Sequence, residues 1–172
     1  IIHRKVANGS YNFSFYREKL ILKGRDSKPR AISIPTNRDK LVLRTLLNYL
    51  SDLFGDGYNN ESIHSRIIAI VHSIKADTYD TFIKIDIKDF FPSINHDQLH
   101  RILTQHNMDD IALDLLQKAI KQTTVAADDK ERVKYANTIG IPQGLSISGL
   151  LASVYLSEID KKHSTCSRYQ YH

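Results

Sequence analysis

Apolar side chains recur every three or four positions along several segments of this chain, a spacing that gathers them on one face of a helix. The leucine-rich segment 43–54 shows the pattern most clearly, and Gly55 ends it. Asn95, with Gln98 three residues later, has the pattern of a capping box and predicts another helix start. The same periodicity predicts further helices over residues 61–74, 110–122 and 146–163.

Alternation of apolar and polar residues predicts strands elsewhere. Ile83, Ile85 and Ile87 alternate with polar residues, as in a strand that has one apolar face. The apolar run stops near Asp86, so this strand is expected to deliver a carboxylate to its end. Alternating residues flanked by turn residues also predict hairpins, over residues 20–34 and 123–137. Helices and antiparallel strands together predict an α+β fold.

Two blocks of this sequence have the spacing of known motifs. In the first, Asp86 is followed five positions later by the aromatic Phe91. In the second, a Pro-Gln-Gly turn at residues 142–144 runs into a helix of small residues at 146–153. The chain thereby resembles the reverse transcriptases, especially the prokaryotic group that includes group II intron, retron and phage-defence enzymes. The basic segment 28–35 resembles the fingers strand of the same family.

The resemblance covers residues 15–172 and implies the right-hand fold of a polymerase. We expect a single partial domain, with fingers over about residues 1–75 and mainly palm over 76–172. Its palm sheet should be antiparallel and packed with helices. Tyr171-His172 resembles the first half of the family's Tyr-x-Asp-Asp box. The chain is therefore expected to be a fragment that ends before two catalytic aspartates, lacks the thumb and is inactive by itself.

The resemblance also implies an activity and a cofactor. The full enzyme would be an RNA-directed DNA polymerase that extends a DNA or RNA primer on an RNA template with deoxynucleotides. Family analogy makes Asp86 the catalytic carboxylate and bridging ligand of two Mg²⁺ or Mn²⁺ ions, with the Ile87 carbonyl as a further ligand. Taken without the flanking motifs, Asp86 is equally compatible with a solvated aspartate at a strand end.

The family places three other kinds of residue around the nucleotide. Phe91 matches the aromatic steric gate that excludes a ribose 2′-hydroxyl, although a Phe at this position also suits a core. Gln143 and Gly144 match the turn that contacts the incoming nucleotide, and Gly144 suits a close backbone approach. The alternative is a simple helix-entry turn. Arg30 matches the fingers arginine that binds the triphosphate with a planar guanidinium.

Composition adds a bias toward polyanions. The net charge of +5 and the pI of about 9.2 favour nucleic acid as a partner without requiring it. A single cysteine, Cys166, excludes an internal disulfide. No run of about 18 apolar residues and no charged-then-apolar leader occurs in the sequence. We therefore expect a cytoplasmic protein with no membrane partner.

Two other functions use a palm of this kind. One is a template-independent DNA polymerase of the phage-abortive type, which implies the same catalytic residues. The other is a non-catalytic, palm-like scaffold that binds nucleic acid. Asp86, Phe91 and Gln143 occur together here, and their presence favours an enzyme over a scaffold. The sequence does not distinguish an intron, a retron or an antiviral defence system as the source.

Overall fold

The computed structural model describes residues 1–22, 24–25, 28–55, 63–76, 81, 83, 85–126 and 136–162. The described elements, in chain order, are α1 (Ile2–Ala7), β1 (Tyr16–Ile21), β2 (Arg30–Ile34), α2 (Asn37–Phe54), α3 (Ile63–Lys75), α4 (Phe90–Ser93), α5 (His96–Gln105), α6 (Asp110–Lys121), β3 (Thr124–Val125) and α7 (Ser148–Lys162). This order of helices and strands confirms the predicted α+β class. None of the helices within these ranges is both long and apolar enough to span a bilayer.

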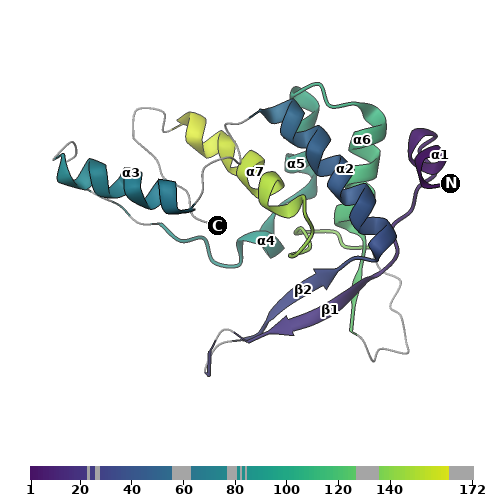
Figure 1. Cartoon of the computed structure of the whole chain (residues 1–172), viewed down its shortest axis with the longest axis horizontal. Helices are drawn as coiled ribbons and strands as arrows, with labels where there is room; N and C mark the ends of the chain where they lie inside the picture. Colours follow the sequence, from purple (N-terminus) through teal and green to yellow (C-terminus); the bar gives the residue numbers. More distant parts are fainter. Residues whose placement is uncertain are drawn as a thin grey trace.

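Helices α2, α5, α6 and α7 form the body of the molecule (Figure 1). Helix α5 packs on α7, and α2 contacts both α6 and α7. The leucines that recur at helical spacing in the sequence are the ones that meet in this core: Leu43, Leu46, Leu50, Leu99, Leu103, Leu116, Leu150 and Leu151. The helices predicted over residues 43–54, 110–122 and 146–163 are therefore confirmed, with ends shifted by a few residues.

Helix α3 also forms where its periodicity predicts, but it lies to one side of the helical body (Figure 1). Its apolar face is not buried in this structure. Four aliphatic side chains keep 40–51% of their surface exposed: Ile67, Ile68, Val71 and Ile74. Periodicity in the sequence thus identifies the apolar face of a helix without identifying what covers that face.

The sheet has the strand order β2-β1-β3 and extends from one end of the helical body (Figure 1). Strands β1 and β2 pair antiparallel, from Arg17 opposite Ile34 to Ile21 opposite Arg30, which confirms the predicted hairpin over residues 20–34. Strand β3 instead pairs parallel to β1, with Tyr16 opposite Thr124. The described sheet is therefore mixed, and two of its three strands lie in the part of the chain expected to form the fingers, so an antiparallel palm sheet stays a prediction.

Hydrogen bonds of Tyr16 on β1 account for the parallel pairing of β1 with β3. The backbone N–H of Tyr16 donates to the Thr123 carbonyl, and its hydroxyl donates to the Ala119 carbonyl at 2.9 Å. These bonds fix β3 beside β1 as the chain leaves α6. The hairpin predicted over residues 123–137 falls mostly on residues 127–135, which lie outside the described residues.

A buried carboxylate fastens the N-terminal segment to α2. Asp39 is fully buried, and its carboxylate accepts hydrogen bonds from the hydroxyls of Tyr11, at 2.7 Å, and Thr36, at 2.6 Å. Thr36 in turn caps the helix by accepting from the Asp39 backbone N–H. Burial raises the pKa of the Tyr11 phenol to about 12, and the hydrogen bond to Asp39 is the next largest cause of this rise. The phenol stays a donor at neutral pH.

The start of α5 is capped as the sequence predicts, with one difference. The Asn95 side chain accepts from the Gln98 backbone N–H at 2.9 Å. The Gln98 side chain does not complete a capping box, because its oxygen accepts from the Tyr155 hydroxyl at 2.9 Å. The glutamine therefore joins α5 to α7, which is a tertiary contact that the local sequence pattern does not contain.

Replacing Asp39 should destabilise the fold strongly. We expect Asp39→Ala to cost about 3 kcal/mol in the free energy of unfolding, because it leaves the buried Tyr11 hydroxyl without its acceptor and removes the bond to Thr36. Urea denaturation measures this cost. The matched control is Asp52→Ala, an exposed aspartate of the same helix, which should change stability by no more than about 0.5 kcal/mol. Equal effects from the two variants would contradict the role given to Asp39.

Candidate active site

Asp86 lies in an extended, solvent-facing segment. Residues 83 and 85–87 belong to no strand, and the side chains of Ile83 and Ile85 are each 82% exposed. The strand expected to end at Asp86 is therefore wrong for these residues. A strand needs a neighbour that takes up its peptide hydrogen bonds, and no strand in the described part of the chain lies beside this segment. The alternation of side chains specifies only which face a strand would bury.

A tight turn follows Asp86 and leads to Phe91. Asp89 adopts left-handed backbone angles, with φ of 51° and ψ of 40°, and its carbonyl accepts from the Ser93 backbone N–H. This turn starts the short helix α4. The Phe91 side chain is half-buried against the apolar core, and its ring lies 5.7 Å from that of Phe90, edge to face. Phe91 therefore contacts the core on one side and keeps part of its surface accessible.

Backbone hydrogen bonds join the turn around Phe91 to the loop that contains Pro-Gln-Gly. The N–H of Gly140 donates to the Ile94 carbonyl at 2.8 Å, and the N–H of Ile141 donates to the Phe91 carbonyl at 2.9 Å. Gly140 has a φ of +79°, and a Cβ there would lie 2.6 Å from the Pro92 carbonyl oxygen. Only glycine fits this conformation and this contact. The two predicted motifs are therefore in direct contact.

The same loop is also bonded to the strand that carries Arg30. The backbone N–H of Ser33 donates to the Gln143 carbonyl at 2.7 Å. Gly144 has a φ of +101°, and a Cβ there would lie 2.5 Å from the Ile32 side chain. Arg30 is exposed and lies two residues before Ile32 on β2, so both point to one face of the strand. The structure thus brings Arg30, Gln143 and Gly144 to one region.

The donors available to a cation here are oxygens. Asp86 and Asp89 are both exposed carboxylates in the segment before α4. Across the described residues, no group of three or more His, Cys, Asp and Glu side chains is arranged to hold a metal ion. A carboxylate and a peptide carbonyl at Asp86 and Ile87 are hard donors of the kind that Mg²⁺ accepts, alongside water and phosphate oxygens. The chemistry of these donors therefore fits a divalent ion.

Two buried polar residues, His96 and Ser148, and the half-buried Asn137 hold this loop, and none of the three is a predicted site residue. His96 Nε2 and Asn137 Nδ2 both contact the Gly140 carbonyl, and the Ser148 hydroxyl donates to the Pro142 carbonyl at 2.7 Å. Ser148 was predicted only as one of the small residues of its helix. The short-range sequence pattern contains no sign of the His96 contact, because His96 and Gly140 are 44 residues apart.

Comparison with known proteins decides the family. A family model described as reverse transcriptase (RNA-dependent DNA polymerase) matches residues 21–172. The chain belongs to the reverse transcriptase family. The matched region of this reverse transcriptase sequence includes every residue predicted here to contact metal or nucleotide. The match assigns no role to any one of them, and the division into fingers and palm near residue 75 stays a prediction.

Several relatives of this reverse transcriptase chain are intron-encoded proteins. An "Uncharacterized 91 kDa protein in cob intron" of Schizosaccharomyces pombe is 31% identical over 168 residues, 93% of this chain and 20% of that protein. The "Group II intron-encoded protein LtrA" of Lactococcus lactis is 28% identical, over 93% of this chain and 27% of that protein. Protein YkfC of Escherichia coli is 26% identical, over 94% of this chain and 44% of that protein. The chain thus spans between a fifth and less than half of these relatives.

Gly140 provides a test of the joined motifs. We expect Gly140→Ala to lower the free energy of unfolding by at least about 3 kcal/mol, because it adds a collision with Pro92 to an unfavourable positive φ. Thermal or urea unfolding measures the loss. Gly55 has a φ of +69° and a ψ of −173° but open space around it, so Gly55→Ala isolates the backbone cost of about 1–3 kcal/mol.

Gly149 completes the comparison. It lies in α7 with neither a positive φ nor a neighbour within 4 Å of an added Cβ. Gly149→Ala should be neutral or stabilising by up to about 1 kcal/mol, since alanine favours helix. If Gly140→Ala were no more harmful than Gly55→Ala, the close contact between the 140–144 loop and Pro92 would be wrong.

Proposed function

We propose that this chain forms the nucleotide-binding part of an RNA-directed DNA polymerase. Its substrates would be deoxynucleotides, an RNA template and a DNA or RNA primer, with Mg²⁺ or Mn²⁺ as cofactor. Membership of the reverse transcriptase family supports the reaction class. The observation that carries the proposal is the direct bonding of the Phe91 turn to the Pro-Gln-Gly loop, and of that loop to the strand of Arg30.

Each residue of this cluster has a role in the proposal. Asp86 and the Ile87 carbonyl would hold the divalent ions, which supply charge neutralisation for nucleotidyl transfer when bound. The Arg30 guanidinium would bind the triphosphate through paired N–H donors. Gln143 and Gly144 would contact the incoming nucleotide, and the glycine lets the backbone approach closely.

Phe91 would act on the sugar. Its half-buried ring is held by the core and by Phe90, so it presents a rigid face rather than a mobile side chain. A rigid aromatic face beside the sugar leaves no room for a 2′-hydroxyl, and discrimination of this kind rests on shape. An enzyme built this way would prefer deoxynucleotides and would make DNA.

Asp86→Asn in the full-length protein tests the metal role. The change keeps the shape of the side chain but removes its negative charge, so primer extension should fall at least about a hundredfold. Because the residue is exposed, the melting temperature should stay near that of the wild type. Asp52→Asn is the control for a general loss of surface charge. Near-normal extension by a folded Asp86→Asn protein would remove Asp86 from the active site.

Phe91→Val tests the steric gate. Truncating the ring should make room for a 2′-hydroxyl, so the ratio of deoxy- to ribonucleotide incorporation efficiency should fall about tenfold or more. Single-nucleotide incorporation kinetics give this ratio, and Phe54→Val is the matched control because it truncates a half-buried ring of the same core on α2, away from Phe91. An unchanged ratio in a folded Phe91→Val enzyme would make Phe91 a core residue only.

A further inference from the structure

The Gly140 carbonyl is the point where a buried side chain, His96, and a half-buried one, Asn137, meet. His96 Nε2 lies 2.6 Å from this oxygen, and Asn137 Nδ2 donates to it at 3.1 Å. A carbonyl oxygen only accepts, so Nε2 of His96 carries the proton. With two donors, both lone pairs of the Gly140 oxygen are used. This oxygen is therefore held in one position by side chains from two different parts of the chain.

Each of the two side chains is itself anchored. His96 is the first residue of α5 and is 9% exposed. Asn137 donates from its side chain to the Ile120 carbonyl at 3.2 Å and from its backbone to the Lys121 carbonyl at 2.7 Å. The Gly140 carbonyl is thereby tied to the start of α5 and to the end of α6.

His96 is a costly choice for a purely structural residue. Its Nδ1 is buried and, among the described residues, has no hydrogen-bond partner. An unsatisfied buried nitrogen destabilises a fold, whereas an aliphatic side chain of similar size would not carry that cost. Stability alone thus does not explain an imidazole here. The function of the ring lies in the one bond that it makes.

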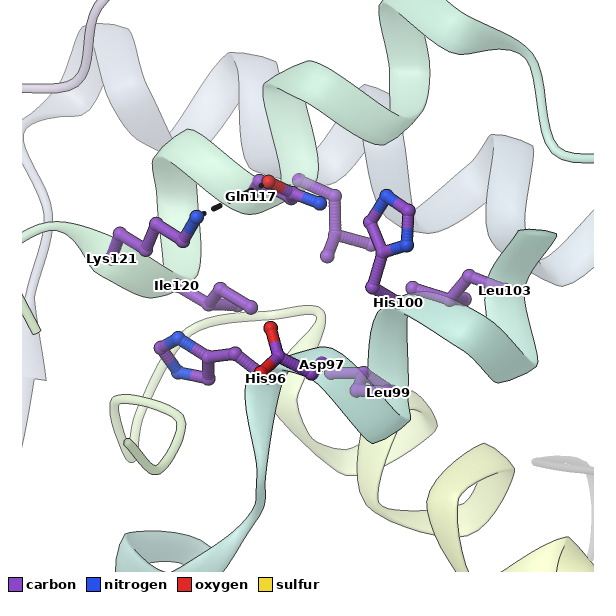
Figure 2. Close-up of a pocket in the computed structure, with 9 residues that line it drawn as sticks. His96, Asp97, Leu99, His100, Leu103, Gln117, Ile120 and Lys121 are labelled. Atoms are coloured by element: carbon purple, nitrogen blue, oxygen red, sulfur yellow. Dashed lines mark hydrogen bonds between the residues drawn. The ribbon is translucent and has the colours of Figure 1, made fainter. Parts of the chain in front are cut away.

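Packing alone does not hold the His96 ring in place without its hydrogen bond to the Gly140 carbonyl. A pocket of about 250 Å³ lies between α5 and α6, and His96 is one of the residues that line it (Figure 2). Figure 2 shows the rings of His96 and His100 pointing in different directions from the same helix. Because there is free space beside it, the His96 ring is able to turn away when its bond to Gly140 is lost.

Movement at Gly140 passes directly to the Pro-Gln-Gly turn. Ile141 and Pro142 are buried, and the proline ring fixes one backbone angle of this short connection. The Gln143 carbonyl is bonded to Ser33 on β2. The connection from Gly140 to Gln143 therefore has little freedom to absorb a displacement at its start.

We infer that His96 and Asn137 are positioning residues for nucleotide binding, acting through the Gly140 carbonyl to set the place of Gln143 and Gly144. The inference rests on the proposed function, in which this turn contacts the incoming nucleotide. Neither side chain touches the nucleotide. Their effect is on the geometry of the turn, so it appears in nucleotide affinity more than in the chemical step.

The test compares four single variants of the full-length enzyme. His96→Leu keeps the bulk and removes the donor, whereas His96→Gln keeps an N–H at similar reach. Asn137→Ala removes the second donor. His100→Leu is the matched control, because it removes an imidazole from the same helix and the same pocket without touching the loop. The measurements are the KM for a deoxynucleotide and kcat per active enzyme on a fixed primer–template, beside the melting temperature.

We expect His96→Leu and Asn137→Ala each to raise KM about tenfold, the effect of one lost hydrogen bond to a buried group, with little change in kcat. His96→Gln should restore most of the affinity, and His100→Leu should bind nucleotide as the wild type does. A fifth protein, the double variant His96→Leu/Asn137→Ala, should raise KM by less than the product of the two single effects, because both donors act on one oxygen.

An unchanged KM in folded His96→Leu enzyme, or an equal rise in His100→Leu, would overturn the inference. A fall in the fraction of active enzyme with normal KM would also overturn it, because it shows a structural role alone. If His96→Leu does not fold, the KM of the Asn137→Ala enzyme tests the inference in its place. Failure of the proposed function looks different, since the wild-type enzyme would then extend no primer at all.

Discussion

Backbone hydrogen bonds of residues 140–144 join three segments that lie far apart in the sequence: this loop itself, the turn at residues 91–94 and strand β2. The N–H groups of the loop donate to Phe91 and Ile94, and a carbonyl accepts from Ser33. Each of these bonds is short and buried or half-buried, so breaking one leaves a backbone group without water as a substitute. Every functional residue proposed here lies on one of the three joined segments or next to it. The places of Phe91, Gln143 and strand β2 relative to one another therefore depend on the conformation of this loop.

The sequence alone predicts the structure correctly where the interactions that determine it are local. Helix α2 follows from its leucine periodicity and from the cap at Thr36, and the β1–β2 hairpin follows from alternation around a turn. Gly144 was expected to need special backbone angles, and it has a φ of +101°. In the helix and the hairpin the decisive interactions are local, so a short window of sequence contains both partners, and the special backbone angles of Gly144 follow from its residue type.

Prediction failed where the partner lies far away in the chain. The alternation around Asp86 has the period of a strand, but a strand also needs a neighbour, and its period says nothing about that neighbour. The parallel pairing of β3 with β1 and the contact between His96 and Gly140 are of the same kind. The roles assigned to Asp86, Arg30 and Gln143 come from the family motifs, and the structure adds their neighbours.

The parallel pair between β1 and β3 also has a consequence for how this chain folds. Tyr16 is bonded to Ala119, across 103 residues, so during synthesis β3 joins the sheet only after the residues between them have been added to the chain. Contacts between distant residues are slow to form, because the loop must close before they contribute. The β1–β2 hairpin closes early and leaves one edge of β1 unpaired during synthesis. An open strand edge pairs readily with other chains, and the pairing of β3 with β1 covers that edge in the folded protein.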